Sequence, residues 1–250
     1  EEYTDLLLKS MTTSKRANNL LVKDGKVYAA MPFGIVVINL KRKEILDTYY
    51  IGKNGAEVNV KQLAILNNRL YAISDKCLYS CDMADNLLDF SRWKSTVFTS
   101  DTLSHIVSYN GKIYLLKNHG LSVYQNDTIT DLYDWNFIHL CADENHLYAM
   151  THNYVYHMVN GQLEGLKELT DIQQVQALNG QYWMAGGGNG VERLSANGEL
   201  DFFHPEGPLV NNPYRMKFEY GKLYIVPGGR WASEDLIDAS FAYYKNGQWG

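Results

Sequence analysis

The chain has 250 residues, of which 46% are hydrophobic, so it is long enough for one large domain or two small ones with a sizeable core. Its 23 Lys and Arg are outnumbered by 28 Asp and Glu, and the formal net charge of -5 argues against nonspecific attraction to nucleic acid or anionic lipid. Apolar runs such as residues 35 to 38 are far shorter than the roughly 20 residues that a membrane-spanning helix needs.

The first predicted hairpin, residues 24 to 40, reads DGKVYAAMPFGIVVINL, with an aromatic residue shortly after an Asp-Gly turn. The same arrangement returns along the chain, as a short polar turn followed by an aromatic residue at the start of an apolar strand. Successive aromatic residues are 43, 43, 34, 35 and 41 positions apart, which defines six repeats of about 40 residues. They are Tyr28, Tyr71, Tyr114, Tyr148, Trp183 and Tyr224.

Each repeat has the composition of several short strands. A first strand, such as residues 61 to 66 or 106 to 109, runs into an Asn/Asp-Gly type turn, which is a strong β-hairpin signal. The aromatic-led second strand follows, and a Gly-containing or polar turn leads into a third. The predicted third strands are residues 34–40, 77–83, 120–126, 154–160, 190–197 and 240–247. Weaker fourth strands are predicted in EILDTYYIG (44–52), NLLDFSRWK (86–94), TITDLYDW (128–135) and ELDFFHPEG (199–207).

Four strands in each of six repeats predict an all-β fold, a β-propeller of about six four-stranded blades. One four-stranded meander cannot cover both of its faces, whereas blades stacked around an axis cover each other, so we expect the six aromatic rings to pack between blades. The best candidate for a short helix is 231–239, in a loop insertion of the last blade. The blades are predicted to begin near residues 18, 60, 103, 136, 171 and 212.

The two ends of the chain leave the closure of the ring open. The last repeat has three predicted strands and stops at NGQWG, without a fourth. Either residues 3–9 supply that strand and close the ring, or the chain is an incomplete portion of a longer multi-propeller protein. Residues 1–17 would then complete another blade.

Motifs that carry chemistry are few. The Gly-rich segment AGGGNG (185–190) is followed by a predicted strand and not by the helix that a phosphate loop needs, so it predicts a hairpin turn. VPGGRW (226–231) has the corresponding place in the last blade and predicts a turn as well. His146, His152 and His157 lack metal-ligand spacing and are interpreted as surface or packing residues. No sialidase box and no G-x-S-x-G motif occurs. We therefore expect no catalytic residue, no metal and no cofactor.

The three cysteines give no sign of a disulfide scaffold. Cys77, Cys81 and Cys141 form neither an even-numbered framework nor a C-x-x-C pair. Cys77 and Cys81 are four positions apart in a predicted strand and hence on one face, so they are interpreted as small packing residues.

Two segments resemble a known family. Residues 8–52, LKSMTTSKRANNLLVKDGKVYAAMPFGIVVINLKRKEILDTYYIG, resemble the blade sequence of PorZ, the accessory protein of the type IX secretion system of Bacteroidetes. Residues 207–231, GPLVNNPYRMKFEYGKLYIVPGGRW, are similar to the same family and to the looser pattern of two-component regulator propellers. The resemblance implies a longer protein with two propellers and a C-terminal sandwich. It also implies export to the outer-membrane surface or periplasm, with the signal peptide outside this chain.

PorZ-like proteins work with the sortase PorU, which attaches secreted cargo to anionic lipopolysaccharide. The resemblance therefore implies a non-enzymatic interaction scaffold whose partners are a PorU-like sortase and lipopolysaccharide or another glycan. One alternative is the glycan-sensing extracellular propeller of a two-component regulator. A second alternative is an axial-site glycoside hydrolase or lyase.

Recognition residues usually lie on loops of a rigid scaffold. The candidate recognition patch is Asn211, Asn212, Arg230 and Trp231, because exposed aromatic and Arg side chains recognise partners well and these residues cluster at the turns of the last blade. A structural interpretation competes: Asn211 and Asn212 cap a turn before Pro213, and Trp231 packs within a loop.

Overall fold

A computed structural model describes residues 13–143, 145–168, 172–179, 181–186, 190–195, 199–203, 207, 213–227 and 241–249. In this part of the chain the strands form six antiparallel four-stranded sheets, each built from four consecutive strands. The predicted all-β fold of about six four-stranded blades is confirmed.

The first three sheets span the N-terminal half of the chain. Their strands are β1 (Asn19–Lys23), β2 (Lys26–Met31), β3 (Gly34–Asn39), β4 (Glu44–Tyr49), β5 (Gln62–Leu66), β6 (Arg69–Ile73), β7 (Cys77–Asp82), β8 (Lys94–Val97), β9 (Leu103–Tyr109), β10 (Lys112–Lys117), β11 (Gly120–Gln125) and β12 (Thr128–Tyr133). Two short 3-10 helices, η1 (Lys53–Gly55) and η2 (Phe90–Arg92), lie in the connections.

The other three sheets follow the same plan. Their strands are β13 (His139–Ala142), β14 (Leu147–Met150), β15 (Tyr154–Val159), β16 (Gln162–Glu168), β17 (Ile172–Leu178), β18 (Gln181–Gly186), β19 (Gly190–Leu194), β20 (Leu200–Phe203), β21 (Pro213–Glu219), β22 (Lys222–Pro227), β23 (Ala242–Lys245) and β24 (Gln248–Trp249).

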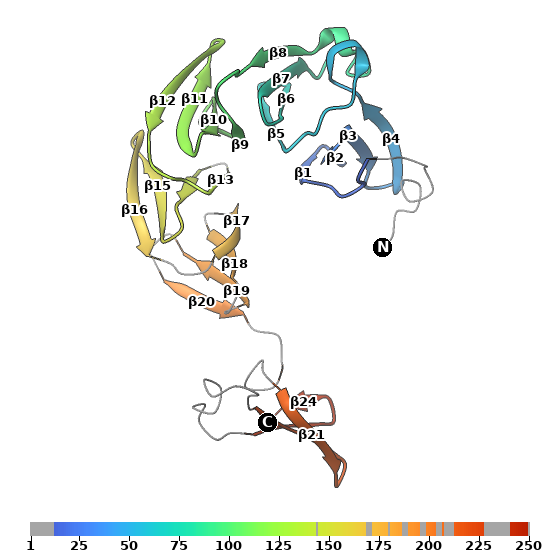
Figure 1. The fold of residues 1–250 in the computed structure, drawn as a ribbon, viewed down its shortest axis with the longest axis vertical. Helices are drawn as coiled ribbons and strands as arrows, with labels where there is room; N and C mark the ends of the chain where they lie inside the picture. Colours follow the sequence, from blue (N-terminus) through green and yellow to red (C-terminus); the bar gives the residue numbers. More distant parts are fainter. Residues whose placement is uncertain are drawn as a thin grey trace.

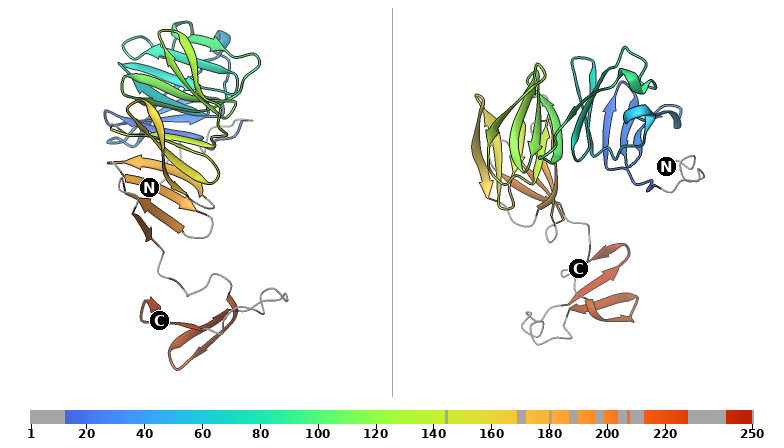
Figure 2. Two further views of the ribbon diagram at one scale, coloured as in Figure 1. Left: turned by 90° about the vertical axis from the view of Figure 1, so that its left-hand side faces the viewer. Right: turned by 45° about the horizontal axis from the view of Figure 1, so that its top comes forward.

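Five sheets form an open arc of propeller blades, with the first strand of each blade inside and the fourth outside (Figure 1). The sixth sheet, β21 to β24, lies apart from the arc in Figure 1 and in both views of Figure 2. The ring of blades is therefore not closed in this structure.

The hairpins form because their turn residues accept positive φ angles. Asn110 and Gly111 join the first two strands of the third blade with φ of 45° and 70°, and Asn160 and Gly161 join β15 to β16 with 49° and 82°. Two consecutive positive φ angles define the tight turn whose twist matches that of paired antiparallel strands. The Asn/Asp-Gly signal thus sets the strand boundaries of most repeats.

Hydrophobic clusters fill the seams between consecutive blades of the arc. Each seam packs the second and third strands of one blade against the first and second strands of the next, and each large apolar side chain buried there stabilises the fold by about 1.5 to 3 kcal/mol. Representative pairs across the four seams are Tyr28 with Leu63, Ile73 with Ile113, Tyr114 with Leu140, and Tyr148 with Tyr182.

The aromatic residues that reveal the repeat occupy equivalent second strands. Tyr28, Tyr114 and Tyr148 are buried in seams, and Tyr71 packs against the second-seam cluster, as expected. For Trp183 and Tyr224 the prediction of packing between blades is wrong. Both are half-buried and belong to none of the seam clusters of the described residues, because the sixth sheet lies apart from the fifth and does not pack against it.

Two fourth strands differ from prediction. Residues 86–93 form η2 and its flanking turns, in which Asp89 Oδ1 accepts a hydrogen bond from Ser91 N at 2.9 Å, and the fourth strand is β8, which begins only at Lys94. This capped turn buries Trp93 in the first seam. The prediction that the last repeat lacks a fourth strand is also wrong, since β24 pairs with β23. Residues 231–239, the predicted short helix, lie outside the described residues.

Candidate functional site

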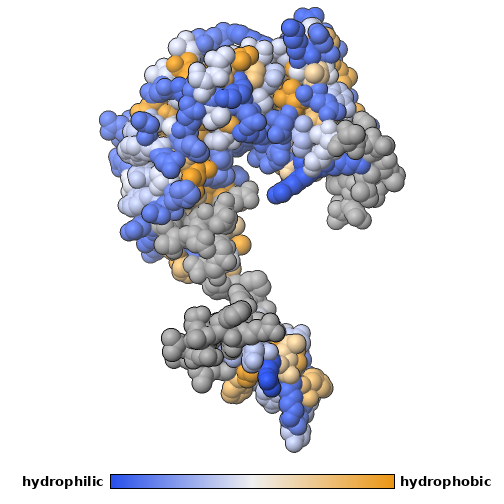
Figure 3. All heavy atoms as spheres, viewed as in Figure 1, coloured by the Kyte–Doolittle hydropathy of each residue, from blue (hydrophilic) through white to orange (hydrophobic). Residues whose placement is uncertain are grey.

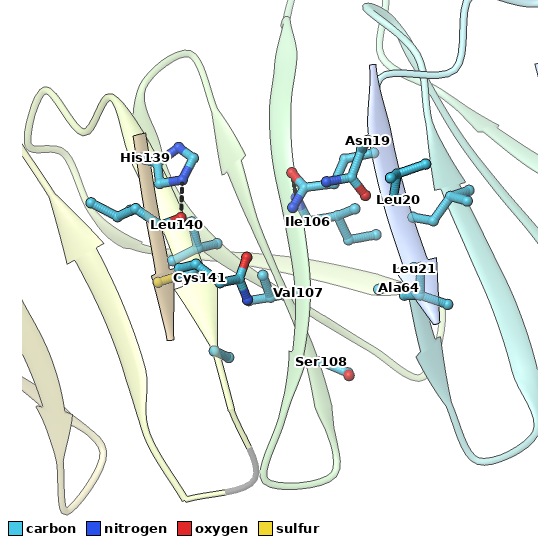
Figure 4. Close-up of a pocket in the computed structure, with 15 residues that line it drawn as sticks. Asn19, Leu20, Leu21, Ala64, Ile106, Val107, Ser108, His139, Leu140 and Cys141 are labelled. Atoms are coloured by element: carbon cyan, nitrogen blue, oxygen red, sulfur yellow. Dashed lines mark hydrogen bonds between the residues drawn. The ribbon is translucent and has the colours of Figure 1, made fainter. Parts of the chain in front are cut away.

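The inner strands of the arc surround a cavity of about 180 Å³ at the propeller axis (Figure 4). Strands β1, β5, β9, β13 and β17 each contribute to its wall. Its polar side chains are Asn19, Gln62, Ser108, His139 and Gln176. None of the described residues that line it is Asp or Glu.

Side chains on the inner strands hydrogen-bond to the backbone of the next blade. Lys61 Nζ donates to the carbonyl of Leu103 at 2.9 Å, and the Ile106 amide donates to Gln62 Oε1 at 3.1 Å, so the second and third blades are joined twice. Asn18 Nδ2 donates to Val60 O at 2.7 Å. These bonds satisfy backbone groups that the inner strands cannot pair with each other, and they stabilise the arc.

Two histidines complete the series of contacts at the axis. The rings of His105 and His139 meet edge to face with centroids 4.5 Å apart, and His139 Nε2 lies 3.0 Å from Val175 O. Removal from water lowers the pKa of His105 to about 3, with the charges of His139 and Lys61 adding to the effect. Burial also lowers the pKa of His139. Both rings are therefore neutral at physiological pH.

The described wall of the axial cavity offers polar groups but no carboxyl group. Glycoside hydrolysis generally uses two carboxyl groups about 5 to 9.5 Å apart. The described wall offers amide, hydroxyl and neutral imidazole groups. Gln62 and His139 are already engaged in inter-blade hydrogen bonds. Among the residues that the structure describes, the axis therefore serves to join the blades.

A charged cluster lies on the third blade, beside a cavity of about 520 Å³. Lys117 Nζ is 2.8 Å from Asp131 Oδ2 and 3.8 Å from Asp101 Oδ2, and Ser122 Oγ donates to Asp131 Oδ1 at 2.7 Å. Asp131, followed by Asp101, raises the pKa of Lys117, and Lys117 with Ser122 lowers the pKa of Asp131. These charges are paired within the blade, so the cluster braces β10 to β12.

The four residues of the predicted recognition patch, Asn211, Asn212, Arg230 and Trp231, lie outside the described residues. The strands on either side of the segment 185–190 pair antiparallel, with Gly186 opposite Gly190, while residues 187–189 lie outside the described part. In the segment 226–231, residues 228–231 also lie outside the described part.

The histidines singled out from the sequence do not converge. His146 Nδ1 lies 3.2 Å from Asp143 Oδ1 and its ring stacks on Tyr148, whereas His152 is exposed and His157 is half-buried on β15. In the described segments no three His, Cys, Asp or Glu side chains gather as a metal site. Sequence reasoning missed His105 and His139; aligning the first strands of the repeats is the signal that could have found them.

The three cysteines are buried free thiols. Burial raises the pKa of Cys141 to about 12 and also raises the pKa values of Cys77 and Cys81. Because the thiolate is the reactive form, these side chains act as packing groups, as the sequence indicates for Cys77 and Cys81.

The arrangement of four-stranded sheets around an axis defines a β-propeller architecture, and the comparisons show which propellers the chain resembles. Residues 1–94, which cover the first blade and most of the second, match the family model described as the N-terminal beta-propeller domain of PorZ. The predicted resemblance of this chain to the PorZ propeller is confirmed. No curated protein sequence matches the chain.

Solved structures share the fold at low sequence identity. PorZ, an essential surface component of the type IX secretion system of Porphyromonas gingivalis, is 23% identical with a TM-score of 0.68 over 94% of this chain. The extracellular domain of the hybrid two-component system BT3049 from B. thetaiotaomicron is 12% identical with a TM-score of 0.60 over 100% of this chain. The chain spans 32% of the PorZ structure and 42% of the BT3049 structure.

Proposed function

We propose that the chain is part of a non-enzymatic interaction scaffold at the bacterial cell surface, in a secretion and cargo-attachment machinery of the PorZ kind. The observation that carries the proposal is the match of residues 1–94 to the PorZ propeller model. The likeness to the PorZ structure over 94% of this chain supports it. In this role the blades present loops to a PorU-like sortase and to anionic lipopolysaccharide or another glycan.

The structure is compatible with a rigid scaffold, because side chains near the axis join neighbouring blades. Lys61 and Gln62 connect the second blade to the third, and His139 Nε2 of the fourth blade lies 3.0 Å from Val175 O of the fifth. Within the described segments no helix has the length and hydropathy needed to cross a membrane.

A pull-down with the full-length protein tests the proposal. The R230A/W231A variant removes an arginine and an aromatic side chain from the predicted patch. A matched control, F90A/R92A, removes the same two kinds of side chain from η2, where Phe90 and Arg92 are exposed.

We expect the wild type and the control to retain a PorU-like sortase and lipopolysaccharide, and R230A/W231A to lose them. Unchanged capture by R230A/W231A would remove the patch from the proposal. Capture of neither partner by the wild type would remove the scaffold role, and hydrolysis of any glycan would overturn the non-enzymatic assignment.

A second candidate is the glycan-sensing extracellular propeller of a two-component regulator, which the likeness to BT3049 over the whole chain favours. The two candidates differ in the rest of the gene product. A C-terminal sandwich supports the secretion scaffold, whereas a membrane helix followed by a kinase supports the sensor.

A further inference from the structure

A polar pocket of about 310 Å³ opens at the seam between the second and third blades. The second blade contributes side chains from β6, β7 and β8, and the third contributes the end of β11 and the turn after it. This pocket, here named the basic seam pocket, is lined chiefly by Arg69, Tyr71, Ser80, Lys94, Tyr124 and Asp127.

Sheet pairing fixes the groups that line the basic seam pocket. Tyr71 lies opposite Ser80, and Ser80 lies opposite Lys94, so the three form one row across the second blade. Ser80 is only 5% exposed. The ring of Tyr124 meets that of Tyr71 edge to face, with centroids 6.3 Å apart. Groups from two blades are thus held at fixed positions, as a binding site requires.

Two of the charges in the pocket neutralise each other. Asp127 lies 2.5 Å from Lys94 Nζ and accepts a hydrogen bond from Tyr124 Oη at 2.7 Å. Both contacts lower the pKa of Asp127, so its carboxylate is ionised at neutral pH.

Arg69 supplies the remaining charge. Its guanidinium donates to Ser80 Oγ at 3.3 Å. Asp82 lies opposite Arg69 across β6 and β7, but Arg69 forms no ion pair with it or with another described carboxylate. The Tyr71 hydroxyl also has no hydrogen-bond partner among the described residues. The pocket therefore carries one net positive charge and donors that are free to bind a ligand, in a chain whose formal net charge is -5.

The first seam provides an internal comparison. Its pocket, of about 380 Å³, has Tyr28 where the second seam has Tyr71, and Lys26 where the second has Arg69. There the charge is reversed, because two lysines face three carboxylates, namely Asp24, Asp47 and Asp85. The same backbone arrangement thus does not produce a basic pocket by itself. The positive charge of the second seam is a property of its side chains.

We propose that the basic seam pocket binds the carboxylate of a sugar acid of hexuronate size. The planar guanidinium of Arg69 can engage both oxygens of a carboxylate, which is the geometry for which arginine is best suited. A single net charge matches a monoanion, whereas the nearby Asp127 carboxylate opposes a phosphate dianion.

The neutral part of the pocket favours a sugar framework. The rings of Tyr71 and Tyr124 offer apolar surface to the C–H groups of a sugar, and the hydroxyls of Tyr71 and Ser80 can bond to its hydroxyls. A peptide carboxylate would leave these groups unused. The volume is at the lower end of small-ligand pockets and suits one ring. This inference does not depend on the proposed scaffold role.

Isothermal titration of the full-length protein tests the inference at low ionic strength, where charge contacts are least screened. The ligands are galacturonate, glucuronate, glucose, inorganic phosphate and a triglutamate peptide. We expect a uronate to bind at least about tenfold more tightly than glucose, because an Arg-carboxylate contact is one of the stronger polar contacts. Phosphate and the peptide should bind more weakly than the uronate.

Two single-residue variants localise the binding. R69M keeps an apolar stem and removes the charge, and it should lower uronate affinity at least about tenfold. K26M, the matched change in the first seam, should leave the affinity unchanged. Y71F, which removes one hydroxyl and keeps the ring, should weaken binding a few-fold and serves if R69M fails to fold.

Each contrary result bears on a specific part of the inference. Equal affinity for uronate and glucose, or unchanged affinity in both R69M and Y71F, would overturn the site. Tighter binding of phosphate would overturn the carboxylate class, and tighter binding of the peptide would overturn the sugar. All of these results leave the pull-down test of the scaffold role unaffected.

Discussion

Two glycines of the first blade should respond very differently to the same substitution. Gly34 begins β3 with a φ of 150°, and a Cβ at this position would lie 2.3 Å from the carbonyl oxygen of Tyr49 on β4. Gly25, in the turn between β1 and β2, has a φ of 72° and no atom within 4 Å of the position of a Cβ. Only Gly34 is thus confined by both its backbone angle and a backbone contact.

The expected cost of each change follows from this geometry. Gly25→Ala adds a side chain to a left-handed turn residue, which costs about 1 to 2 kcal/mol. Gly34→Ala adds about 1 to 3 kcal/mol of backbone strain and also displaces the Tyr49 carbonyl, for a total of about 3 to 5 kcal/mol. Because the neighbouring Tyr49 side chain is buried in the first seam, the shift disturbs that seam as well.

Urea and thermal unfolding of the two variants measure the difference. With about 2 to 4 °C lost per kcal/mol in a protein of this size, G34A should unfold about 10 °C below the wild type and G25A about 4 °C below it. Equal destabilisation of the two variants, or a smaller effect of G34A, would refute the contact between β3 and β4 on which the calculation rests.

Two further predictions concern buried titratable groups. Because the pKa of His105 is lowered to about 3 while that of an unfolded histidine is near 6.5, unfolded chains take up a proton that the folded protein does not as pH falls below about 6.5. The free energy of unfolding is therefore retained above that pH and falls below it. H105Q should reduce this loss by up to about 1.4 kcal/mol per pH unit, measured from the urea midpoints of the wild type and the variant at pH 7 and 5. Equal acid sensitivity of the wild type and H105Q would count against the prediction. Since burial raises the pKa of Cys141 to about 12, a thiol reagent at pH 8 should label Cys141 only after unfolding in urea, and rapid labelling of the native protein would contradict its burial.

The repeat was predictable from sequence because its turns have a strict chemical requirement. Consecutive positive φ angles favour Asn, Asp and Gly, so pairs such as Asn110-Gly111 mark the hairpins at a regular spacing. The second strand that follows carries the seam aromatic, as at Tyr114. Both signals are local, and a local signal can be read from one sequence without knowledge of the neighbouring blades.

The parts that failed depend on contacts between distant residues. Residues 86–94 have the composition of a strand, but Asp89 caps a 3-10 turn and Trp93 enters the seam, so tertiary packing overrides the strand pattern. The packing of Trp183 between blades was predicted from its repeat position, yet burial there requires a covering sheet. The sequence of a segment indicates which secondary structure it favours, whereas contacts with the neighbouring blade determine which structure it adopts and which side chains are buried.

The hydrophobic surface follows the same logic. The sixth sheet, which lies apart from the arc, shows hydrophobic residues on its surface (Figure 3). Among its exposed apolar side chains are Met216, at 67% exposure, and Phe218, at 71%. Both lie on the face of that sheet that also carries Ile225, which is itself buried. In the arc, the corresponding first-strand positions, such as Leu63 and Leu140, are buried in seams. The sequence of β21 has the apolar pattern of a first strand, whereas the burial of those apolar side chains depends on whether a neighbouring blade covers them.

The candidate binding groups could not be predicted for a related reason. Arg69 occupies a position two residues before a seam aromatic, where Lys26 and Lys112 also occur, so its charge is visible in the repeat. What distinguishes Arg69 is its surroundings: the one carboxylate that lines its pocket, Asp127, is held by Lys94, whereas three carboxylates line the pocket that contains Lys26. That distinction depends on side chains from two blades, which no spacing in the sequence relates.

Stability and recognition are assigned to different positions of the same repeat. At the axis, Lys61 and Gln62 are bonded to the backbone of the next blade, so replacing either weakens the attachment between blades. At the second seam, the ring of Tyr71 packs against Tyr124 of the third blade, whereas the Arg69 guanidinium and the Tyr71 hydroxyl form no hydrogen bond to another blade among the described residues. Substitutions at the pocket-lining positions of a seam can therefore change the charge of its pocket while the axial hydrogen bonds keep the blades together. The opposite net charges of the first and second seam pockets are consistent with such variation.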